Sequence, residues 1–275
     1  MQRWWSAFDD VIRGWIRDDT ESMTCWAKYR ETGNHQLLQQ MAQRGSVDAD
    51  SHERVAVWEA FLYQRGHIDA FHRALTPIIK WRENPPEAIG VIDYGCGSGS
   101  VAFAFDEHFE GETPLFYVGL DHHAPSLDLC DAMLSEVMAG DGGLCVTVDS
   151  KSVDALDCLD SLDGADRVFL TMGYLLCQPA VTSDVARDLA NSVARVTNEL
   201  GMTRLIVVDA PLSRSKYPDL MKGLRSAGLD IDEKISAARD YEMRFPALDG
   251  EAFRGRRLSK ADVHYFTLRS QRAVD

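Results

Sequence analysis

Three glycines and a nearby aspartate have the types and spacing of a ligand-binding turn. Asp93 stands two residues before Gly95, and further glycines follow at positions 97 and 99. The apolar run at 88–92 predicts a buried parallel strand, and a helix is expected from about residue 100 to 109. A strand that ends in Asp-x-Gly-x-Gly-x-Gly and leads into a helix is typical of a cofactor-binding turn. Glycine tolerates positive φ there and lets a ligand lie against bare backbone.

The turn differs from one that holds a dinucleotide, which has the pattern Gly-x-Gly-x-x-Gly. The sixth residue counted from Gly95 is Ser100, and the third glycine comes one position early. A carboxylate at Asp93 repels a pyrophosphate but suits the ammonium group of an amino-acid ligand. The stretch 91–100, VIDYGCGSGS, therefore resembles motif I of the class I S-adenosylmethionine-dependent methyltransferases. A NAD-dependent oxidoreductase is the more distant alternative.

A second acidic residue follows the next expected strand, LFYVGL at 115–120. Asp121 ends this strand, 22 residues after Gly99, and an acid at this spacing hydrogen-bonds ribose hydroxyls. The resemblance implies that Asp121 holds the ribose of the cofactor and that Asp149 and Ser150, after the third strand, lie near its adenine. A helix N-cap is the alternative role for Asp149. The full set of expected cofactor-binding residues is Asp93, Gly95, Cys96, Gly97, Gly99, Asp121, His122, Asp149, Ser150 and Thr171.

The fourth expected strand, 166–172, ends in the region that corresponds to motif IV, which faces the transferred methyl group in this family. The chain has Thr-Met-Gly-Tyr at 171–174 in place of Asp/Asn-Pro-Pro-Tyr/Phe, which argues against methylation of an exocyclic base amine. Tyr174 is the candidate that faces the substrate, and a partly buried tyrosine at the strand end is the alternative. A general base is needed only if the nucleophile arrives protonated. The candidates are Tyr174, His122, His123 and Asp209, of which Tyr174 and His122 are the predicted catalytic residues.

Composition bounds the class of protein. The 275 residues are 45% hydrophobic, enough for one large α/β domain with an appendage, and no apolar stretch reaches 18 residues. The N-terminus lacks the apolar core and cleavage site of a signal peptide. The six cysteines form no Cys-x-x-Cys pair and the eight histidines are scattered, so we expect reduced thiols, a cytoplasmic location and no metal.

Charge is distributed unevenly along the chain. The net charge is −14, and residues 86–200 carry 4 basic and 20 acidic side chains, a net charge of −16. This region would repel a phosphate backbone. The basic run Arg254–Lys260 is interpreted as a solvated loop between strands, or alternatively as a grip on RNA together with the N-terminal helices.

Two regions are expected. All six tryptophans lie in the first 81 residues, and the Pro85-Pro86 pair breaks any helix. Residues 1–85 show helical periodicity and are predicted as an all-helical segment that packs on the cofactor side, with Gly66 between its last two helices. Residues 86–275 alternate strands and helices. The remaining strands are expected at 144–149, 204–209, 235–245 and 263–269, and helices at 125–139, 180–199 and 215–227, with a short one near 152–160.

The resemblance implies a Rossmann-like three-layer sandwich whose seven-stranded, mostly parallel sheet has the order 3-2-1-4-5-7-6. It also implies a methyltransferase that uses S-adenosylmethionine. Acidity around the site favours a small, uncharged or cationic acceptor over a polyanion. Two alternatives stay open: an RNA methyltransferase, for example one that acts on ribosomal RNA, and a non-catalytic scaffold that binds the cofactor. No membrane partner is expected, and the oligomeric state is not predicted.

Overall fold

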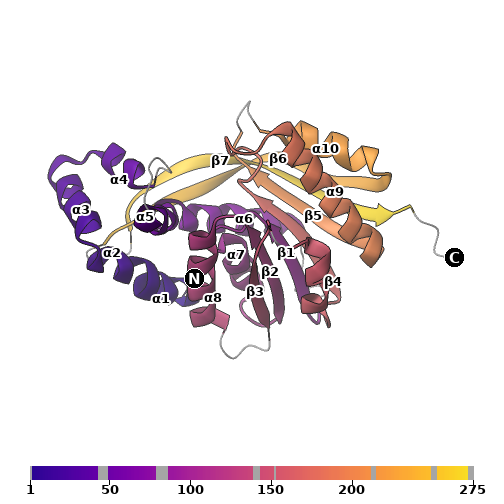
Figure 1. Ribbon diagram of the computed structural model, residues 1–275, viewed down its shortest axis with the longest axis horizontal. Helices are drawn as coiled ribbons and strands as arrows, with labels where there is room; N and C mark the ends of the chain where they lie inside the picture. Colours follow the sequence, from indigo (N-terminus) through magenta and orange to yellow (C-terminus); the bar gives the residue numbers. More distant parts are fainter. Residues whose placement is uncertain are drawn as a thin grey trace.

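The protein is described by a computed structural model that covers residues 2–42, 49–78, 86–138, 143–151, 153–211, 215–248 and 253–271. Its strands form one seven-stranded sheet of order β3-β2-β1-β4-β5-β7-β6 (Figure 1). Strands β1 to β5 are parallel, and β7 runs antiparallel to both β5 and β6. The expected Rossmann-like fold and strand order are therefore confirmed. The first five strands are Ile89–Tyr94, Leu115–Asp121, Leu144–Asp149, Arg167–Gly173 and Met202–Asp209.

Helices connect the strands near their expected positions. They are α7 (Ser100–Phe109), α8 (Ala124–Met138), the 3₁₀ helix η3 (Ala155–Leu162), α9 (Ser183–Leu200) and α10 (Tyr217–Ser226). The helix α9 begins at its N-cap Thr182, whose hydroxyl accepts a hydrogen bond from the Val185 backbone N–H at 3.3 Å. Parallel strands need such crossovers, and their helices cover both faces of the sheet.

Neighbouring residues of each strand belong to two different cores. Val91 of β1 packs with α6, α7 and α8, whereas Ile92 packs with η3, α9 and α10. Side chains alternate across a strand, so a strand buried on both faces reads as a continuous apolar run. This is why the sequence at 88–92 is apolar without alternation.

The N-terminal segment is helical throughout its described residues, as expected. Its elements are α1 (Gln2–Ala7), the π-helix η1 (Phe8–Arg13), α2 (Gly14–Asp18), α3 (Thr20–Thr32), α4 (His35–Met41), α5 (Ala49–Glu59), the π-helix η2 (Ala60–Gln64) and α6 (Arg65–Ile78). Its buried aromatic side chains share one core with α7, α8 and one face of the sheet. Whether residues 1–85 form a separate domain stays a prediction.

The expectation that Gly66 separates two helices was wrong. Gly66 is buried inside α6 and keeps right-handed helical backbone. A glycine ends a helix where it takes the left-handed conformation, as Gly33 does after α3 with a φ of 65°. The irregularity in this helix is instead the π-helical turn η2, a feature found often at functional sites.

The last two strands are longer than expected and form an arm. Strands β6 (Leu229–Pro246) and β7 (Phe253–Ser270) are paired nearly to their ends. The last residue of β5, Asp209, pairs with Asp262, so the earlier part of β7 extends past the carboxyl end of β5 while paired with β6. The arm curves over the N-terminal helices (Figure 1).

The basic run Arg254–Lys260 therefore lies in strand β7, and its interpretation as a loop was wrong. In this strand, the backbone N–H and C=O groups of the basic run form hydrogen bonds with β6, whereas in an exposed loop they would form hydrogen bonds with water. Of this run, the structure describes the side chains of residues 258–260.

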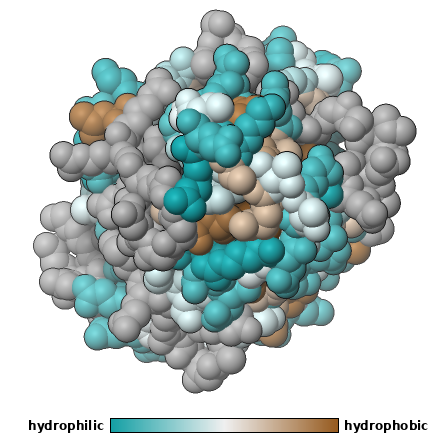
Figure 2. Space-filling view, turned by 90° about the vertical axis from the view of Figure 1, so that its left-hand side faces the viewer, coloured by the Kyte–Doolittle hydropathy of each residue, from teal (hydrophilic) through white to brown (hydrophobic). Residues whose placement is uncertain are grey.

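The surface formed by the N-terminal helices is largely hydrophilic, with a small apolar patch near its middle (Figure 2). Among the described residues, no helix combines the length and the apolar character needed to cross a membrane.

The interface between α6 and the sheet yields a stability prediction. Phe71 of α6 is fully buried, and a Cβ added to Gly173 would lie only 2.8 Å from its ring. Phe71→Ala leaves a cavity at this contact and is expected to lower the free energy of unfolding by about 3–5 kcal/mol. Urea denaturation measures the loss. Met23→Ala, at a site 37% exposed, is the control and should change stability by less than about 0.5 kcal/mol.

Candidate active site

The loop between β1 and α7 is shaped by three glycines in the left-handed region. Their φ values are 72° at Gly95, 53° at Gly97 and 81° at Gly99. A Cβ at Gly95 would lie 2.8 Å from the Leu175 side chain, and one at Gly99 would lie 2.8 Å from Cys130 Sγ. A Cβ at Gly97 would meet nothing within 4 Å. The two outer glycines thus allow close packing, and the middle one presents bare backbone to open space.

Backbone hydrogen bonds hold this loop against β2. The N–H groups of Gly95 and Cys96 both donate to the Leu120 carbonyl, at 2.7 and 3.1 Å. The Gly97 N–H donates to Asp121 Oδ2 at 3.0 Å, and the Gly99 N–H donates to the Cys96 carbonyl at 3.0 Å. Among the described residues, the Ser98 N–H has no hydrogen-bond partner. One amide of the loop is therefore left for a ligand.

Asp121 lies where the sequence places it, at the carboxyl end of β2 beside the loop. Besides Gly97, its carboxylate accepts hydrogen bonds from the backbone N–H groups of His122 (2.7 Å) and His123 (3.0 Å). A carboxylate offers about four acceptor positions, so one remains for a further donor. The His122 ring is exposed, with Nδ1 3.5 Å from Asp121 Oδ1. Asp121 and His122 are thus side by side at the rim of the loop.

Asp93 is buried behind the loop and links three strands through hydrogen bonds. Its carboxyl oxygens accept hydrogen bonds from the Tyr117 hydroxyl of β2 and the Thr171 hydroxyl of β4, both at 2.8 Å. Burial raises the pKa of Asp93 to about 7, and the nearby Asp121 adds to the rise, while the two hydrogen bonds oppose it. Asp93 and Thr171 are only 1% and 0% exposed, so a direct contact of either with a ligand stays a prediction.

Cys96 is also buried, with its sulfur against Gly119 of β2. A Cβ at Gly119 would lie 2.9 Å from that sulfur. The neighbouring Cys130 thiol, and next burial, raise the pKa of Cys96 well above its usual value. The thiol is therefore protonated and packs as a small apolar side chain.

The residues after β3 are more exposed. Asp149 Oδ1 accepts a hydrogen bond from the Lys151 N–H at 2.9 Å, and the Ser150 N–H donates to the Asp121 carbonyl at 2.8 Å. The N-cap of η3 is Asp154, which forms a capping box with Asp157. The alternative role of Asp149 as that helix's N-cap was therefore wrong, and its role toward adenine stays a prediction.

Tyr174 follows β4 with two unusual features. Its φ is 55°, and among the described residues its buried hydroxyl has no partner with hydrogen-bond geometry. The backbone is fixed on both sides, because its N–H donates to Val208 O at 2.7 Å and its carbonyl accepts from Gln178 Nε2 at 3.0 Å. Burial, and next the neighbouring Tyr241 hydroxyl, raise the pKa of Tyr174 well above its usual value. Strain and an unpaired buried donor at the end of a strand are typical of functional positions.

Sequence reasoning missed the aromatic residues that surround Tyr174. The imidazole of His67, on α6, stacks on the Tyr174 ring with centroids 4.0 Å apart, and Tyr241 of β6 meets it edge-on at 6.3 Å. Burial lowers the pKa of His67 to about 4, so this imidazole is neutral at physiological pH. Within the described part of the chain, its ring nitrogens make no hydrogen bond. No spacing in the sequence relates positions 67, 174 and 241.

The other candidate bases are engaged in structural contacts. His123 Nδ1 lies 2.7 Å from Ser126 Oγ at the start of α8. Asp209 is buried, and its carboxylate accepts hydrogen bonds from the Ser215 hydroxyl (2.6 Å) and the Ala210 N–H (3.0 Å).

Two elements border this site from outside the sheet. The N–H of Glu242 on the arm donates to Asp69 Oδ2 of α6 at 2.8 Å, and Arg17 of α2 donates to the Leu248 carbonyl at 3.3 Å. The N-terminal helices and the arm are therefore joined at these two points. The Glu242–Asp69 contact adjoins Tyr241 and His67 in the sequence, the two residues that contact the Tyr174 ring.

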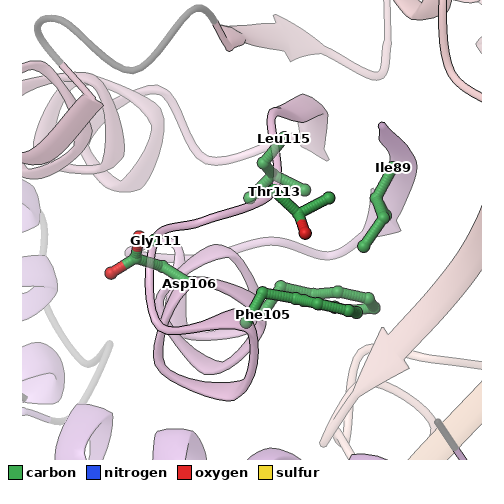
Figure 3. A pocket seen from close by; sticks show the side chains of 7 residues that line it. Ile89, Phe105, Asp106, Gly111, Thr113 and Leu115 are labelled. Atoms are coloured by element: carbon green, nitrogen blue, oxygen red, sulfur yellow. The ribbon is translucent and has the colours of Figure 1, made fainter. Parts of the chain in front are cut away.

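A separate surface depression lies at the opposite, amino end of the sheet (Figure 3). It is lined by Ile89, Phe105, Asp106, Phe109, Gly111, Thr113 and Leu115. It touches none of the residues described above. In the described residues, no group of three histidine, cysteine, aspartate or glutamate side chains is arranged to hold a metal ion.

Comparison with known proteins gives the following. No protein-family model and no curated protein matches the sequence. A precorrin-6Y C5,15-methyltransferase from Geobacter metallireducens is 16% identical over 65% of this chain and 79% of that one, with a TM-score of 0.40. A SAM-dependent methyltransferase from Aquifex aeolicus is 12% identical over 81% and 99%, with a TM-score of 0.44.

An arsenic(III) S-adenosylmethionine methyltransferase from Chlamydomonas reinhardtii is 15% identical over 73% of this chain and 72% of that one, with a TM-score of 0.38. These solved structures are methyltransferases with different acceptors. At such low scores the assignment of the fold rests on the strand order itself. The chain has a Rossmann-like fold, and its strand order is the one that the resemblance of the 91–100 stretch implied.

The buried carboxyl of Asp93 predicts a pH dependence of stability. The folded protein, with a pKa of about 7, keeps this proton where the unfolded chain, with a pKa near 3.8, releases it. The contribution of Asp93 to stability therefore falls from about pH 4 to about pH 7. In Asp93→Asn this dependence is absent, so the unfolding free energy of the variant minus that of the wild type should rise across this window and then level off. Urea denaturation of both proteins at a series of pH values between 4 and 8 tests this. If the difference in unfolding free energy between variant and wild type stayed constant, Asp93 would be ionised throughout this range in the folded protein, against the prediction.

The unpaired hydroxyl of Tyr174 predicts a stabilising substitution. Tyr174→Phe keeps the ring and its stacking but removes a buried donor that has no hydrogen-bond partner among the described residues. We expect the free energy of unfolding to rise by about 1 kcal/mol. The matched control is Tyr117→Phe, which removes a paired hydroxyl and should lower it. A loss of stability in Tyr174→Phe would show that its hydroxyl has a favourable partner.

Proposed function

We propose that this protein is an S-adenosylmethionine-dependent methyltransferase that acts on a small-molecule acceptor. The observation that carries the proposal is the loop at 95–99. Its Gly97 presents bare backbone to open space, its Ser98 N–H is unpaired among the described residues, and the Asp121 carboxylate borders it. These features suit a ligand that needs a backbone donor at one point and a carboxylate acceptor for hydroxyl groups at another.

Each predicted cofactor residue has a place in this proposal. The backbone at Gly95, Cys96, Gly97 and Gly99 supports the ligand, Asp121 and His122 lie at the ribose end, and Asp149 and Ser150 at the adenine end. Asp93 and Thr171 hold the carboxyl ends of β1, β2 and β4 in register from behind. Their effect on the ligand is exerted through the position of the loop.

When bound, S-adenosylmethionine would supply a methyl group from its sulfonium. The lone pair of the acceptor would attack the methyl carbon in line with the C–S bond, whose electron pair would leave with sulfur as a neutral thioether. Because the leaving group is neutral, the protein mainly has to align the reacting atoms, and alignment alone can provide about 7–11 kcal/mol of barrier lowering. In this proposal, Tyr174 orients the acceptor by hydrogen bonding. His67 is neutral, and among the described residues its ring nitrogens have no hydrogen-bond partner, so it can accept a hydrogen bond from a protonated nucleophile and orient it; its lowered pKa makes it a weak base. His122, the other predicted catalytic residue, lies at the ribose end, which suits cofactor binding better.

The environment of Tyr174 favours an uncharged or cationic acceptor. Tyr174 and His67 are both neutral, and aromatic rings surround them. A polyanion in this setting would lose its hydration without a counter-charge among these groups. The RNA alternative relies on the N-terminal helices together with Arg254–Lys260. The basic run lies on the arm, and no described contact links that run itself to the loop at 95–99. The cofactor-binding scaffold is the outcome if binding occurs without transfer.

Cofactor binding is tested by calorimetry with S-adenosylhomocysteine. Gly97→Arg fills the open space above the loop and should abolish binding, and Asp121→Ala should weaken it about tenfold to a hundredfold through loss of charge-assisted hydrogen bonds. Gly201→Arg is the matched control, because Gly201 has a φ of 74° and open space but lies after α9. Wild-type affinity in Asp121→Ala would refute the role of that residue.

The acceptor class is tested with cofactor labelled in its methyl group and fractionated cell extract. We expect the label to appear in small molecules, and less of it with Tyr174→Phe. Label in RNA would support the alternative, and binding without label transfer to any fraction would favour the scaffold.

A further inference from the structure

We propose that Gln64 is a positioning residue that fixes the glycine loop for cofactor binding and links the loop to helix α1. The inference rests on the proposed function and concerns a residue that does not itself touch the ligand. Gln64 is the last residue of the π-helix η2, is 1% exposed, and reaches the loop from 34 positions away in the sequence.

Gln64 uses both ends of its side-chain amide. Its Nε2 donates to the Ser98 carbonyl at 2.7 Å, and its Oε1 accepts a hydrogen bond from Trp4 Nε1 at 3.2 Å. Trp4 belongs to α1 and is 1% exposed. The amide therefore forms a bridge from the first helix of the chain to the loop.

The bridge controls the orientation of a specific peptide group. The carbonyl of Ser98 and the N–H of Gly99 belong to the same peptide, and that N–H donates to the Cys96 carbonyl. This peptide is thus held at both ends, by Gln64 and by Cys96. On the other side, the Cys96–Gly97 peptide is held at both ends by Gly99 and Asp121.

Between these two fixed peptides lies the Gly97–Ser98 peptide, whose N–H has no partner among the described residues. Glycine peptides rotate at little steric cost, so a loop with three glycines needs such restraints to keep one orientation. Without the Gln64 hydrogen bond, the Ser98–Gly99 peptide would populate other orientations. The apparent affinity for the cofactor would then fall in proportion to the fraction of molecules whose loop has the binding-competent orientation.

The π-helical turn explains how Gln64 reaches the loop. The helix from α5 to α6 is continuous, and the extra residue of a π-turn shifts which side chains face the sheet. Arg65, the next residue, pairs with Glu107 of α7 at 2.5 Å; the Arg65 side chain is buried and that of Glu107 is mostly covered. This ion pair anchors α6 to α7 and keeps the Gln64 amide opposite Ser98.

Two independent readouts test the inference. The first is the affinity for S-adenosylhomocysteine measured by calorimetry, and the second is hydrogen exchange of the peptide covering residues 95–99 in the ligand-free protein. Gln64→Met keeps the side-chain length but removes both hydrogen bonds. We expect its affinity to fall about threefold to tenfold and its loop to exchange faster.

Gln64→Glu separates positioning from packing. The introduced carboxylate still accepts from Trp4 but repels the Ser98 carbonyl, so affinity should fall at least as far as in Gln64→Met. When that carboxyl is protonated it becomes a donor. Its affinity, relative to wild type at the same pH, should therefore recover as pH is lowered. A role in packing alone predicts no such recovery.

The matched control is Trp58→Phe, which removes a buried indole hydrogen bond to Ser22 Oγ (2.9 Å) within the N-terminal helices. It should lower stability without changing affinity or loop exchange. The inference is overturned if Gln64→Met binds within twofold of wild type and exchanges at the wild-type rate, or if Trp58→Phe has the same effects. If wild type itself does not bind the probe, the proposed function fails, while the exchange experiment still decides the role of Gln64.

Discussion

The close approach of bare backbone to neighbouring side chains between β1 and α7 is the constraint on which the site depends. Leu175 and Cys130 occupy the volume that a Cβ would need at Gly95 and Gly99. The chain can therefore turn sharply from the sheet into α7 only with glycine at these positions, and their positive φ values exclude most other residues for a second reason. The turn leaves Gly97 facing outward, so the geometry that joins strand to helix is also the geometry that exposes backbone to a ligand.

A turn of this kind needs fixed strand ends, and buried polar groups provide them. Asp93 joins β1 to hydroxyls on β2 and β4, the strands on either side, at the point where strand order reverses. Ligands bind at such reversal points in open α/β sheets. A buried carboxyl is costly when charged, and its raised pKa shows the consequence: the group is half protonated near neutrality. Asp93 thus fixes the ends of three strands by hydrogen bonds but lowers the stability of the fold at neutral pH.

Local patterns predicted most of the fold but little of the acceptor side. Apolar runs placed β1 to β5, and helical periodicity placed α7 to α10, because burial on one or two faces imposes these periods. The spacing of Gly95, Gly99 and Asp121 identified the loop and its acid. By contrast, Gln64, His67 and Tyr241 reach the site from a helix and a strand that pack there only in the tertiary structure, so no local pattern marks them. Residue type alone predicted a helix break at Gly66 and a loop at Arg254–Lys260. In the structure Gly66 is packed inside α6, and the basic run is part of strand β7 because it pairs with β6.

The N-terminal helices and the arm contribute side chains that cover the end of strand β4. A Rossmann-like sheet alone leaves the space over the end of β4 open to water. Here α6 contributes Phe71 and His67, the arm contributes Tyr241, and the Glu242–Asp69 contact joins the two. The result is an aromatic, neutral environment around the Tyr174 phenol, whose hydroxyl has no hydrogen-bond partner in the described part of the chain, within a sequence region that is otherwise strongly acidic. In the proposed reaction, methyl transfer to a neutral or cationic acceptor would generate no new negative charge for this site to stabilise. Exclusion of water and alignment of the acceptor are then the contributions that this arrangement can make.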